Sequence, residues 1–180
     1  LGRLAIILHA HLPYVRKNEK NSLEEDWLFQ AILECYIPLL QVIESSQKEY
    51  PSNTKLTISL SPTLLSLLQN KHIKETFPSW IKTRMDFLNE LPDKEKSASE
   101  FLMRNLNDKY LYWKQFSGDL IQRFKILNNS GNLDILTCAA THSYLPILRE
   151  NPETVKGQIQ TAIRSHKNIF EMQPLGIWLP

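Results

Sequence analysis

Imidazole and indole side chains occur at three places in this chain of 180 residues, each at the end of an apolar segment. His9 and His11 follow the apolar run 4–8, His142 follows the run 133–138, and Trp178 lies in the last one, 175–179. Imidazoles can ligate a metal, transfer a proton or bond to sugar hydroxyls. Side chains two positions apart in extended chain share a face, so His9 and His11 are expected to act as a pair.

These residue types leave several roles open. The His9 and His11 pair could chelate zinc with His142 as a third ligand, contact a substrate, or simply pack, one ring in the rim and one capping a loop. Trp178 is either a core indole or part of a pocket wall. Trp27 lies on a predicted helix and either packs there or, being close to the first loop, lies at the rim.

Short strands alternate with long helices along the chain. Strands are predicted at 4–8, 55–60, 133–138 and 175–179 from their apolar runs and alternation. This order, β-α-β-α-β-α-β, is typical of a parallel sheet or a (β/α) barrel. Right-handed crossovers bring the carboxyl ends of such strands to one rim, where ligands bind. The histidines and Trp178 are therefore expected to meet there.

The helices between these strands have recognisable starts. Ser22 and Glu25 form a predicted capping box, and Pro38 is expected to kink the helix that follows. Ser61 and Pro62 begin a short helix up to residue 70. Residues 72–130 are expected to contain no strand, with helices near 78–90 and 98–128. Asn151 starts the last helix, with Val155, Ile159, Ile163 and His166 on one face.

Composition excludes several classes of protein. A formal net charge of +2 does not suggest binding to nucleic acid or to an anionic membrane. No unbroken apolar run approaches the ~20 residues of a membrane helix. Cys35 and Cys138 are the two cysteines, which favours a reducing cytoplasm over a disulfide framework. Ser143 lacks the setting of a nucleophilic serine, and no glycine-rich phosphate loop is present.

Three motifs resemble glycoside hydrolase family 57. They are His9-Ala10-His11-Leu12-Pro13-Tyr14, Ala140-Thr141-His142-Ser143-Tyr144-Leu145-Pro146 and Gly176-Ile177-Trp178-Leu179-Pro180. The second motif, together with Glu24-Glu25-Asp26-Trp27-Leu28-Phe29 and Leu60-Ser61-Pro62-Thr63-Leu64-Leu65, is similar to the 1,4-alpha-glucan branching enzymes of the family. The resemblance spans essentially the whole chain. One departure is Ser143, where the family pattern has glycine.

The resemblance implies an α/β fold, with residues 1–180 as the N-terminal portion of an incomplete (β/α)7 TIM-like barrel that has parallel strands and long helical insertions. It also implies a retaining mechanism. The nucleophile, a glutamate, is expected directly after Pro180, and the general acid, an aspartate, further downstream. No catalytic carboxylate is then expected within 1–180. We expect this stretch alone to be inactive and to aggregate through unpaired strand edges.

The resemblance also implies roles for individual residues. His9 and His142 would contact the sugar at the cleavage subsite, His11 and Trp178 would shape the pocket, and Trp27 would stack on glucose rings. The implied partners are an α-1,4-glucan, such as amylose or glycogen, and the rest of the barrel, with no metal and no cofactor.

The implied activity is the formation of α-1,6 branches on an α-1,4-glucan. Three alternatives remain. The parent protein could be an α-amylase or 4-α-glucanotransferase of the same family. It could be a non-catalytic glucan-binding subunit, or a metal-dependent deacetylase-like barrel.

Overall fold

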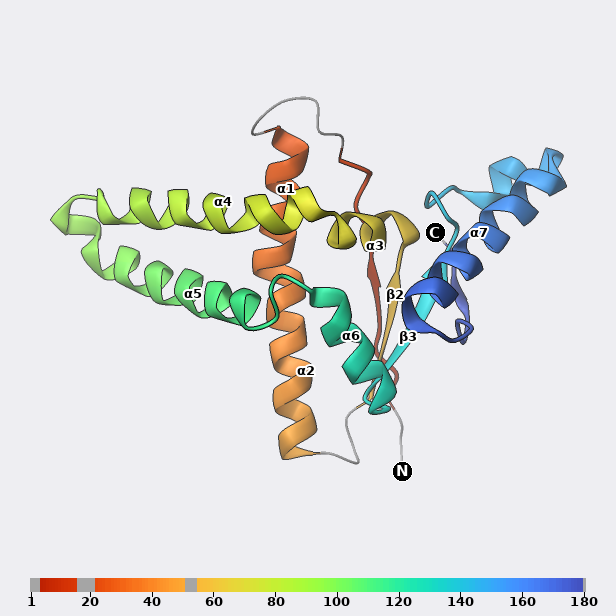
Figure 1. Cartoon of the computed structure of the whole chain (residues 1–180), viewed down its shortest axis with the longest axis horizontal. Helices are drawn as coiled ribbons and strands as arrows, with labels where there is room; N and C mark the ends of the chain where they lie inside the picture. Colours follow the sequence, from red (N-terminus) through yellow and green to blue (C-terminus); the bar gives the residue numbers. More distant parts are fainter. Residues whose placement is uncertain (1–3, 16–21, 51–54, 180) are drawn as a thin grey trace. The chain divides into compact units, whose positions relative to one another are not determined.

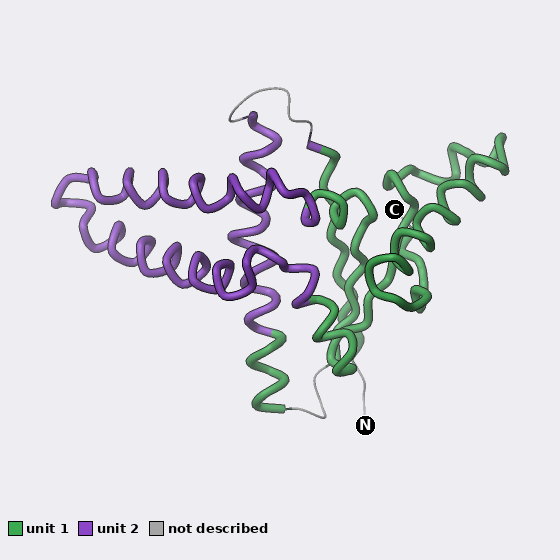
Figure 2. Tube along the Cα trace, viewed as in Figure 1, with its two compact units in different colours: residues 1–14, 43–67, 124–180 green, residues 15–42, 68–123 purple. Residues whose placement is uncertain are grey.

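The computed structural model describes residues 4–15, 22–50 and 55–179. Part of the first predicted loop (16–21) and Pro180, the last residue of the third motif, lie outside the described residues. The chain divides into two compact units (Figure 2). The first unit comprises residues 1–14, 43–67 and 124–180, and the second comprises residues 15–42 and 68–123. The predicted rim residues belong to the first unit, apart from Trp27.

The first unit is built on a four-stranded parallel sheet (Figure 1). Its strands are β1 (Ile7–Ala10), β2 (Leu56–Leu60), β3 (Leu133–Cys138) and β4 (Ile177–Trp178). They neighbour one another in chain order, β1-β2-β3-β4, so the winding never reverses direction. This is how a barrel winds, whereas a doubly wound sheet reverses its strand order. The predicted arrangement of parallel strands is therefore confirmed.

The first strand lies further along the chain than predicted. It covers Ile7–Ala10 rather than residues 4–8, because pairing with β2 begins at Ile7, opposite Thr57. Leu4 is 86% exposed and Ile7 is 51% exposed. The apolar run 4–8 is therefore not buried on both faces. In the described chain β1 and β4 are the sheet edges. The last strand is only Ile177–Trp178, shorter than the predicted 175–179.

Helices of the first unit begin where the caps predicted them. Helix α3 (Pro62–Gln69) follows Ser61, whose hydroxyl accepts a hydrogen bond from the Leu64 N–H at 3.2 Å. Helix α7 (Pro152–Phe170) follows Asn151, whose side chain accepts from the Thr154 N–H at 3.1 Å.

The second unit is helical. It contains α1 (Leu23–Ala31), a π-helical turn (Ile32–Tyr36), the start of α2 (Ile37–Glu49), α4 (Lys71–Asn89), a 3-10 turn (Asp93–Glu95), α5 (Lys96–Gln115) and the start of α6 (Leu120–Asn129). Helices α4 and α5 run side by side as a hairpin (Figure 1). Phe77 contacts both Phe29 and Trp113, with ring centroids 5.6 and 4.3 Å apart. All of residues 72–130 are described, and they contain no strand, as predicted.

Three predictions about the helices need correction. The helix expected at 98–128 is two helices, α5 and α6, separated at Gly118, whose φ is +74°. The helix expected at 78–90 begins at Lys71 and has Pro78 inside it. Only half of the predicted capping box forms: Ser22 accepts from the Glu25 N–H, but the Glu25 carboxylate pairs with His72 at 2.8 Å. The Glu25 carboxylate thus pairs with a side chain 47 positions away instead of the Ser22 N–H.

Just before Pro38, where a kink was predicted, the structure has a π-helical turn at Ile32–Tyr36. The Ile37 N–H bonds to the Ile32 carbonyl, five residues back. Proline has no N–H to continue the regular ladder, so a wider turn at this point is a common solution.

One helical stretch, Leu23–Glu49, is long and apolar enough to cross a membrane by length and composition alone. The sequence criterion missed it because polar residues interrupt the apolar ones. Its best window is 44% buried within the protein. Leu28, Ile32 and Ile37 are completely buried, as expected for a core helix of a folded protein.

Candidate functional site

Four ring side chains stack at the carboxyl edge of the sheet, all within the first unit. The order is His11, His142, His9 and Trp178. His11 and His142 are nearly parallel, with centroids 3.9 Å apart and planes inclined by 8°. His9 lies between His142 and Trp178, with centroids at 5.0 and 5.3 Å. The structure thus brings together four of the five predicted site residues, and we call these four the histidine stack.

The topology explains why these rings meet. His9 lies in β1 and Trp178 in β4, opposite Cys138 of β3. His142 follows the end of β3 by four residues, and His11 follows β1 directly. Side chains two positions apart in extended chain point to the same face, so His9 and His11 both reach the stack, with the ring of His142 between them.

Hydrogen bonds tie the histidine stack together. His9 Nε2 and His142 Nε2 are 2.8 Å apart, so one nitrogen donates its N–H to the lone pair of the other. These two nitrogens therefore hold a single proton. His9 Nδ1 is buried and has no hydrogen-bond partner among the described residues. Protonating both rings would break the bond and place two positive charges in contact.

The electrostatic setting favours the neutral forms of His9 and His11. Burial, and then the charge of His142, lower the pKa of His9. Burial, followed by His142 and His9, lowers the pKa of His11 to about 4. Neutral imidazoles each offer one donor and one acceptor, which suits the hydroxyls of a sugar. In the described chain these four side chains interact with imidazole, indole and hydroxyl groups, and no carboxylate takes part.

The geometry of the histidine stack does not suit the zinc site that was one of the alternatives for these histidines. His9 Nε2 and His142 Nε2 face each other across 2.8 Å, a hydrogen-bond distance that leaves no room for a metal ion between them. Tetrahedral zinc requires ligands that converge on the metal. Among residues 4–15, 22–50 and 55–179, no group of three or more His, Cys, Asp or Glu side chains could hold a metal ion.

Two hydroxyl groups that hold His11 were not recognised as site residues. Ser61 Oγ lies 2.9 Å and Thr63 Oγ1 lies 3.1 Å from His11 Nδ1, and the two oxygens are 3.1 Å apart. Ser61 follows the second predicted strand and was predicted to cap a helix, a role that it also has, but its contact with His11 was not predicted. A serine that caps a helix at the end of a strand is already at the rim, and this was the available signal.

Trp27 and Asp26 lie on α1 in the second unit. Trp27 is 52% exposed, so it is not a core side chain. Asp26 accepts hydrogen bonds from Trp80, Arg84 and Gln30. Burial alone would raise its pKa, but these bonds and the Arg84 charge lower it. Asp26 is thus engaged within the second unit, whereas the indole of Trp27 remains accessible and its stacking role stays a prediction.

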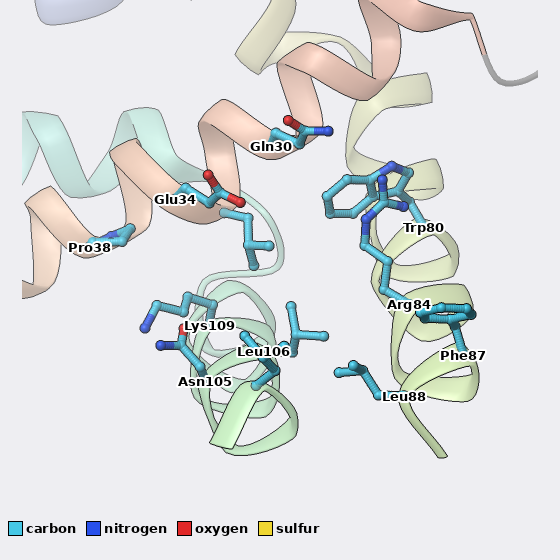
Figure 3. A pocket seen from close by; sticks show the side chains of 12 residues that line it. Gln30, Glu34, Pro38, Trp80, Arg84, Phe87, Leu88, Asn105, Leu106 and Lys109 are labelled. Atoms are coloured by element: carbon cyan, nitrogen blue, oxygen red, sulfur yellow. The ribbon is translucent and has the colours of Figure 1, made fainter. Parts of the chain in front are cut away.

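The second unit also contains a pocket of about 670 Å³ between the helical segment 30–38, α4 and α5 (Figure 3). Leu33, Leu88 and Leu106 give it apolar walls, and Glu34 and Lys109 add charges. At this pocket the Arg84 guanidinium carbon lies 3.4 Å from the centroid of the Trp80 ring, over its face. No predicted site residue lines it.

Acidification is expected to destabilise the protein through His11 and His166. Burial lowers the pKa of each to about 4, from an ordinary value of 6.5. Between these values the unfolded chain binds more protons than the folded chain, so the free energy of unfolding falls as the pH falls. Urea midpoints measured at about pH 7, 5.5 and 4.5 should decrease in that order.

The control variant for this prediction is His166→Leu, because His166 is 1% exposed and outside the histidine stack. Between about pH 7 and 4.5 the urea midpoint of this variant should fall less than that of the wild-type protein. Asp26 and Glu171 have lowered pKa values and ordinary values of 3.8 and 4.5, so their stabilising effect is lost mainly below this window. An unchanged midpoint from about pH 7 to 4.5 would show that these imidazoles are not held neutral by the fold.

Comparison with known proteins gives a consistent result. The family model for glycosyl hydrolase family 57 matches residues 5–180. The chain is 34% identical to the 1,4-alpha-glucan branching enzyme of Thermococcus kodakarensis, over 99% of this chain and 27% of that protein. It is also 20% identical to a probable 1,4-alpha-glucan branching enzyme of Mycobacterium tuberculosis, over 99% of this chain and 37% of the other.

Solved structures agree on the fold. The GH57-type branching enzyme of Pyrococcus horikoshii superposes with a TM-score of 0.90 at 35% identity, covering 99% of this chain and 34% of the other. The alpha-amylase AmyC of Thermotoga maritima superposes with a TM-score of 0.89 at 30% identity, covering 99% of this chain and 35% of the other. The chain spans about a third of these solved chains, and the four parallel strands with their helices correspond to the N-terminal part of a (β/α)7 barrel. On this evidence the chain belongs to glycosyl hydrolase family 57.

Proposed function

We propose that the parent protein is a 1,4-alpha-glucan branching enzyme, which cleaves an α-1,4 linkage and re-forms it as an α-1,6 branch. The observation that carries this proposal is the 34% identity to a curated branching enzyme across 99% of the chain. The histidine stack at the rim supports it, because a row of imidazole donors and acceptors next to an indole suits a glucosyl unit.

The proposed reaction is a double displacement with retention. The nucleophile is a glutamate expected directly after Pro180, and the general acid is an aspartate further downstream. Retention requires the two carboxyl groups about 5 Å apart, one attacking the anomeric carbon while the other protonates the leaving oxygen. In the second half, a 6-hydroxyl of another glucan segment attacks the glucosyl ester in place of water. The carboxyl group that gave its proton to the leaving oxygen then accepts one from this hydroxyl.

We assign the residues of this chain to holding the donor sugar. His9 and His142 contact its hydroxyls at the cleavage subsite, and His11 and Trp178 shape the pocket beside them. Because their pKa values are lowered, His9 and His11 can bind hydroxyls as neutral rings, without competing for the proton that the general acid delivers. Trp27, with 52% of its surface exposed, offers an aromatic face to a glucose ring further along the bound glucan.

A second candidate function is an α-amylase or 4-α-glucanotransferase. The likeness to the Thermotoga maritima alpha-amylase at 30% identity favours it. The three activities share the donor site and differ in the acceptor, which is water, a 4-hydroxyl or a 6-hydroxyl. The residues that choose the acceptor are expected beyond the part of the barrel described above.

We further propose that the remaining strands of the same barrel cover the sheet edges. Ile7 of β1 is 51% exposed, and Leu175 and Leu179 beside β4 are 73% and 65% exposed. Neighbouring strands of a closed barrel would bury these side chains. A cytoplasmic location is part of the same proposal, since Cys35 and Cys138 are both free.

The test incubates the parent protein with linear amylose and counts new α-1,6 linkages and new reducing ends. We expect many new branch points with few new reducing ends. Reducing ends without branches would instead identify a hydrolase, and altered chain lengths with neither would identify a 4-α-glucanotransferase. Glucan binding without turnover would support a non-catalytic subunit. Activity lost to a chelator and restored by zinc would support the metal-dependent alternative.

A further inference from the structure

The backbone of His142 adopts a left-handed conformation, with φ at +57°. This conformation costs a non-glycine residue roughly 1–2 kcal/mol, so neighbouring interactions have to hold it. One is a tight turn, in which the His142 N–H donates to the Ala139 carbonyl at 2.8 Å. The turn alone does not tie this loop to the rest of the first unit.

Gln158 of helix α7 provides that tie. Its side-chain oxygen accepts from the Thr141 N–H at 2.9 Å, and its amide nitrogen donates to Thr141 Oγ1 at 3.0 Å. Its main-chain carbonyl accepts from the Ala140 N–H at 3.3 Å. A single residue of α7 therefore holds both residues that precede His142.

The position of His142 depends closely on these two residues. Its ring stacks on His11 at 3.9 Å and shares a proton with His9 at 2.8 Å, so a small shift of the loop would break both contacts. Thr141 and its bonds to Gln158 are exposed. Breaking them exchanges protein hydrogen bonds for bonds to water, which changes stability little and orientation more.

We propose that Gln158 is a positioning residue of the donor site, which sets the orientation of His142 by holding Ala140 and Thr141. This inference rests on the proposed function, because it assigns His142 to sugar binding. Gln158 does not touch the substrate. It acts through His142, and the prediction is that its effect on turnover disappears when the His142 ring is absent.

The experiment compares three variants of the full-length protein on amylose. Gln158→Leu keeps the size of the side chain, removes its hydrogen bonds to Thr141 and leaves the main-chain bond to Ala140 in place. Gln158→Glu keeps two oxygens that accept from the Thr141 N–H and hydroxyl. Gln160→Leu makes the same change at an exposed position of the same helix. We expect kcat/KM to fall about tenfold in Gln158→Leu, with Gln158→Glu and Gln160→Leu within about twofold of wild type.

Two further readouts separate positioning from general damage. In a His142→Ala background, adding Gln158→Leu should change kcat/KM by less than about twofold. The imidazole ¹⁵N signals of His142 should shift in Gln158→Leu but not in Gln158→Glu. Equal loss of activity with and without the His142 ring, or unshifted signals, would overturn the assignment. Wild-type protein without glucan turnover would overturn the proposed function instead, and the ¹⁵N comparison would still test Gln158.

Discussion

Replacing His142 with alanine is expected to lower kcat/KM on amylose about 10- to 100-fold while the protein stays folded. This range corresponds to roughly 1.4–2.7 kcal/mol, which is about one or two hydrogen bonds lost in the transition state. His142 is at the centre of the histidine stack, where it contacts His11 and His9. Its loss would remove the proposed contact with the sugar and leave the two neighbouring rings without their shared partner.

The measurement combines initial rates with a urea unfolding midpoint for each variant. His142→Gly is the matched control, because it removes the same ring and also relieves the left-handed strain at φ +57°. Its midpoint should be at or above that of His142→Ala, and its rate should be as low. An unchanged rate in either variant would remove His142 from the donor site. If the loss of rate in the two variants parallels the loss of their urea midpoints, the effect of the substitution is on stability and not on the donor site.

Replacing Gly118 with alanine is expected to destabilise the second unit strongly. Gly118 joins α5 to α6 with φ at +74°, and an added Cβ would lie 2.7 Å from the Trp113 ring. Trp113 is 3% exposed and packs against Phe77, so it cannot move aside without disturbing the core. Backbone strain of roughly 1–2 kcal/mol and overpacking of roughly 1–3 kcal/mol together predict a loss of about 2–5 kcal/mol.

Gly131→Ala is the matched control for this prediction. Gly131 has φ at +80°, but nothing lies within 4 Å of an added Cβ. It should therefore cost only the strain, roughly 1–2 kcal/mol. Urea unfolding followed by tryptophan fluorescence measures both variants. Equal losses in the two variants would mean that the contact between residue 118 and Trp113 contributes nothing.

Much of the fold could be predicted from local patterns. Each strand showed as an apolar run, and caps at Ser61 and Asn151 marked the starts of two helices, because capping depends on residues only a few positions apart. The break between α5 and α6 could have been predicted too. Gly118 is followed by Asp119, whose side chain accepts from the Gln122 N–H, and a glycine followed by a capping residue is a strong signal for one helix ending and another starting.

Other features depended on contacts between distant residues. The start of β1 at Ile7 is set by its pairing with β2, which an apolar run does not reveal. Glu25 left its predicted capping box because His72 came within 2.8 Å of it. Gln158 looked like any polar residue on an amphipathic helix, since its partner Thr141 is 17 positions away.

The sequence alone determined the family, the order of strands and helices, and which ring side chains would gather at one rim. These follow from motifs and from the rule that parallel strands joined by right-handed crossovers end on the same side. Only the tertiary structure decided how the rings meet: stacked, sharing a proton between His9 and His142, with His11 held by two hydroxyls. Ring orientation depends on side-chain packing and on hydrogen bonds between residues far apart in the chain, and no local pattern encodes these.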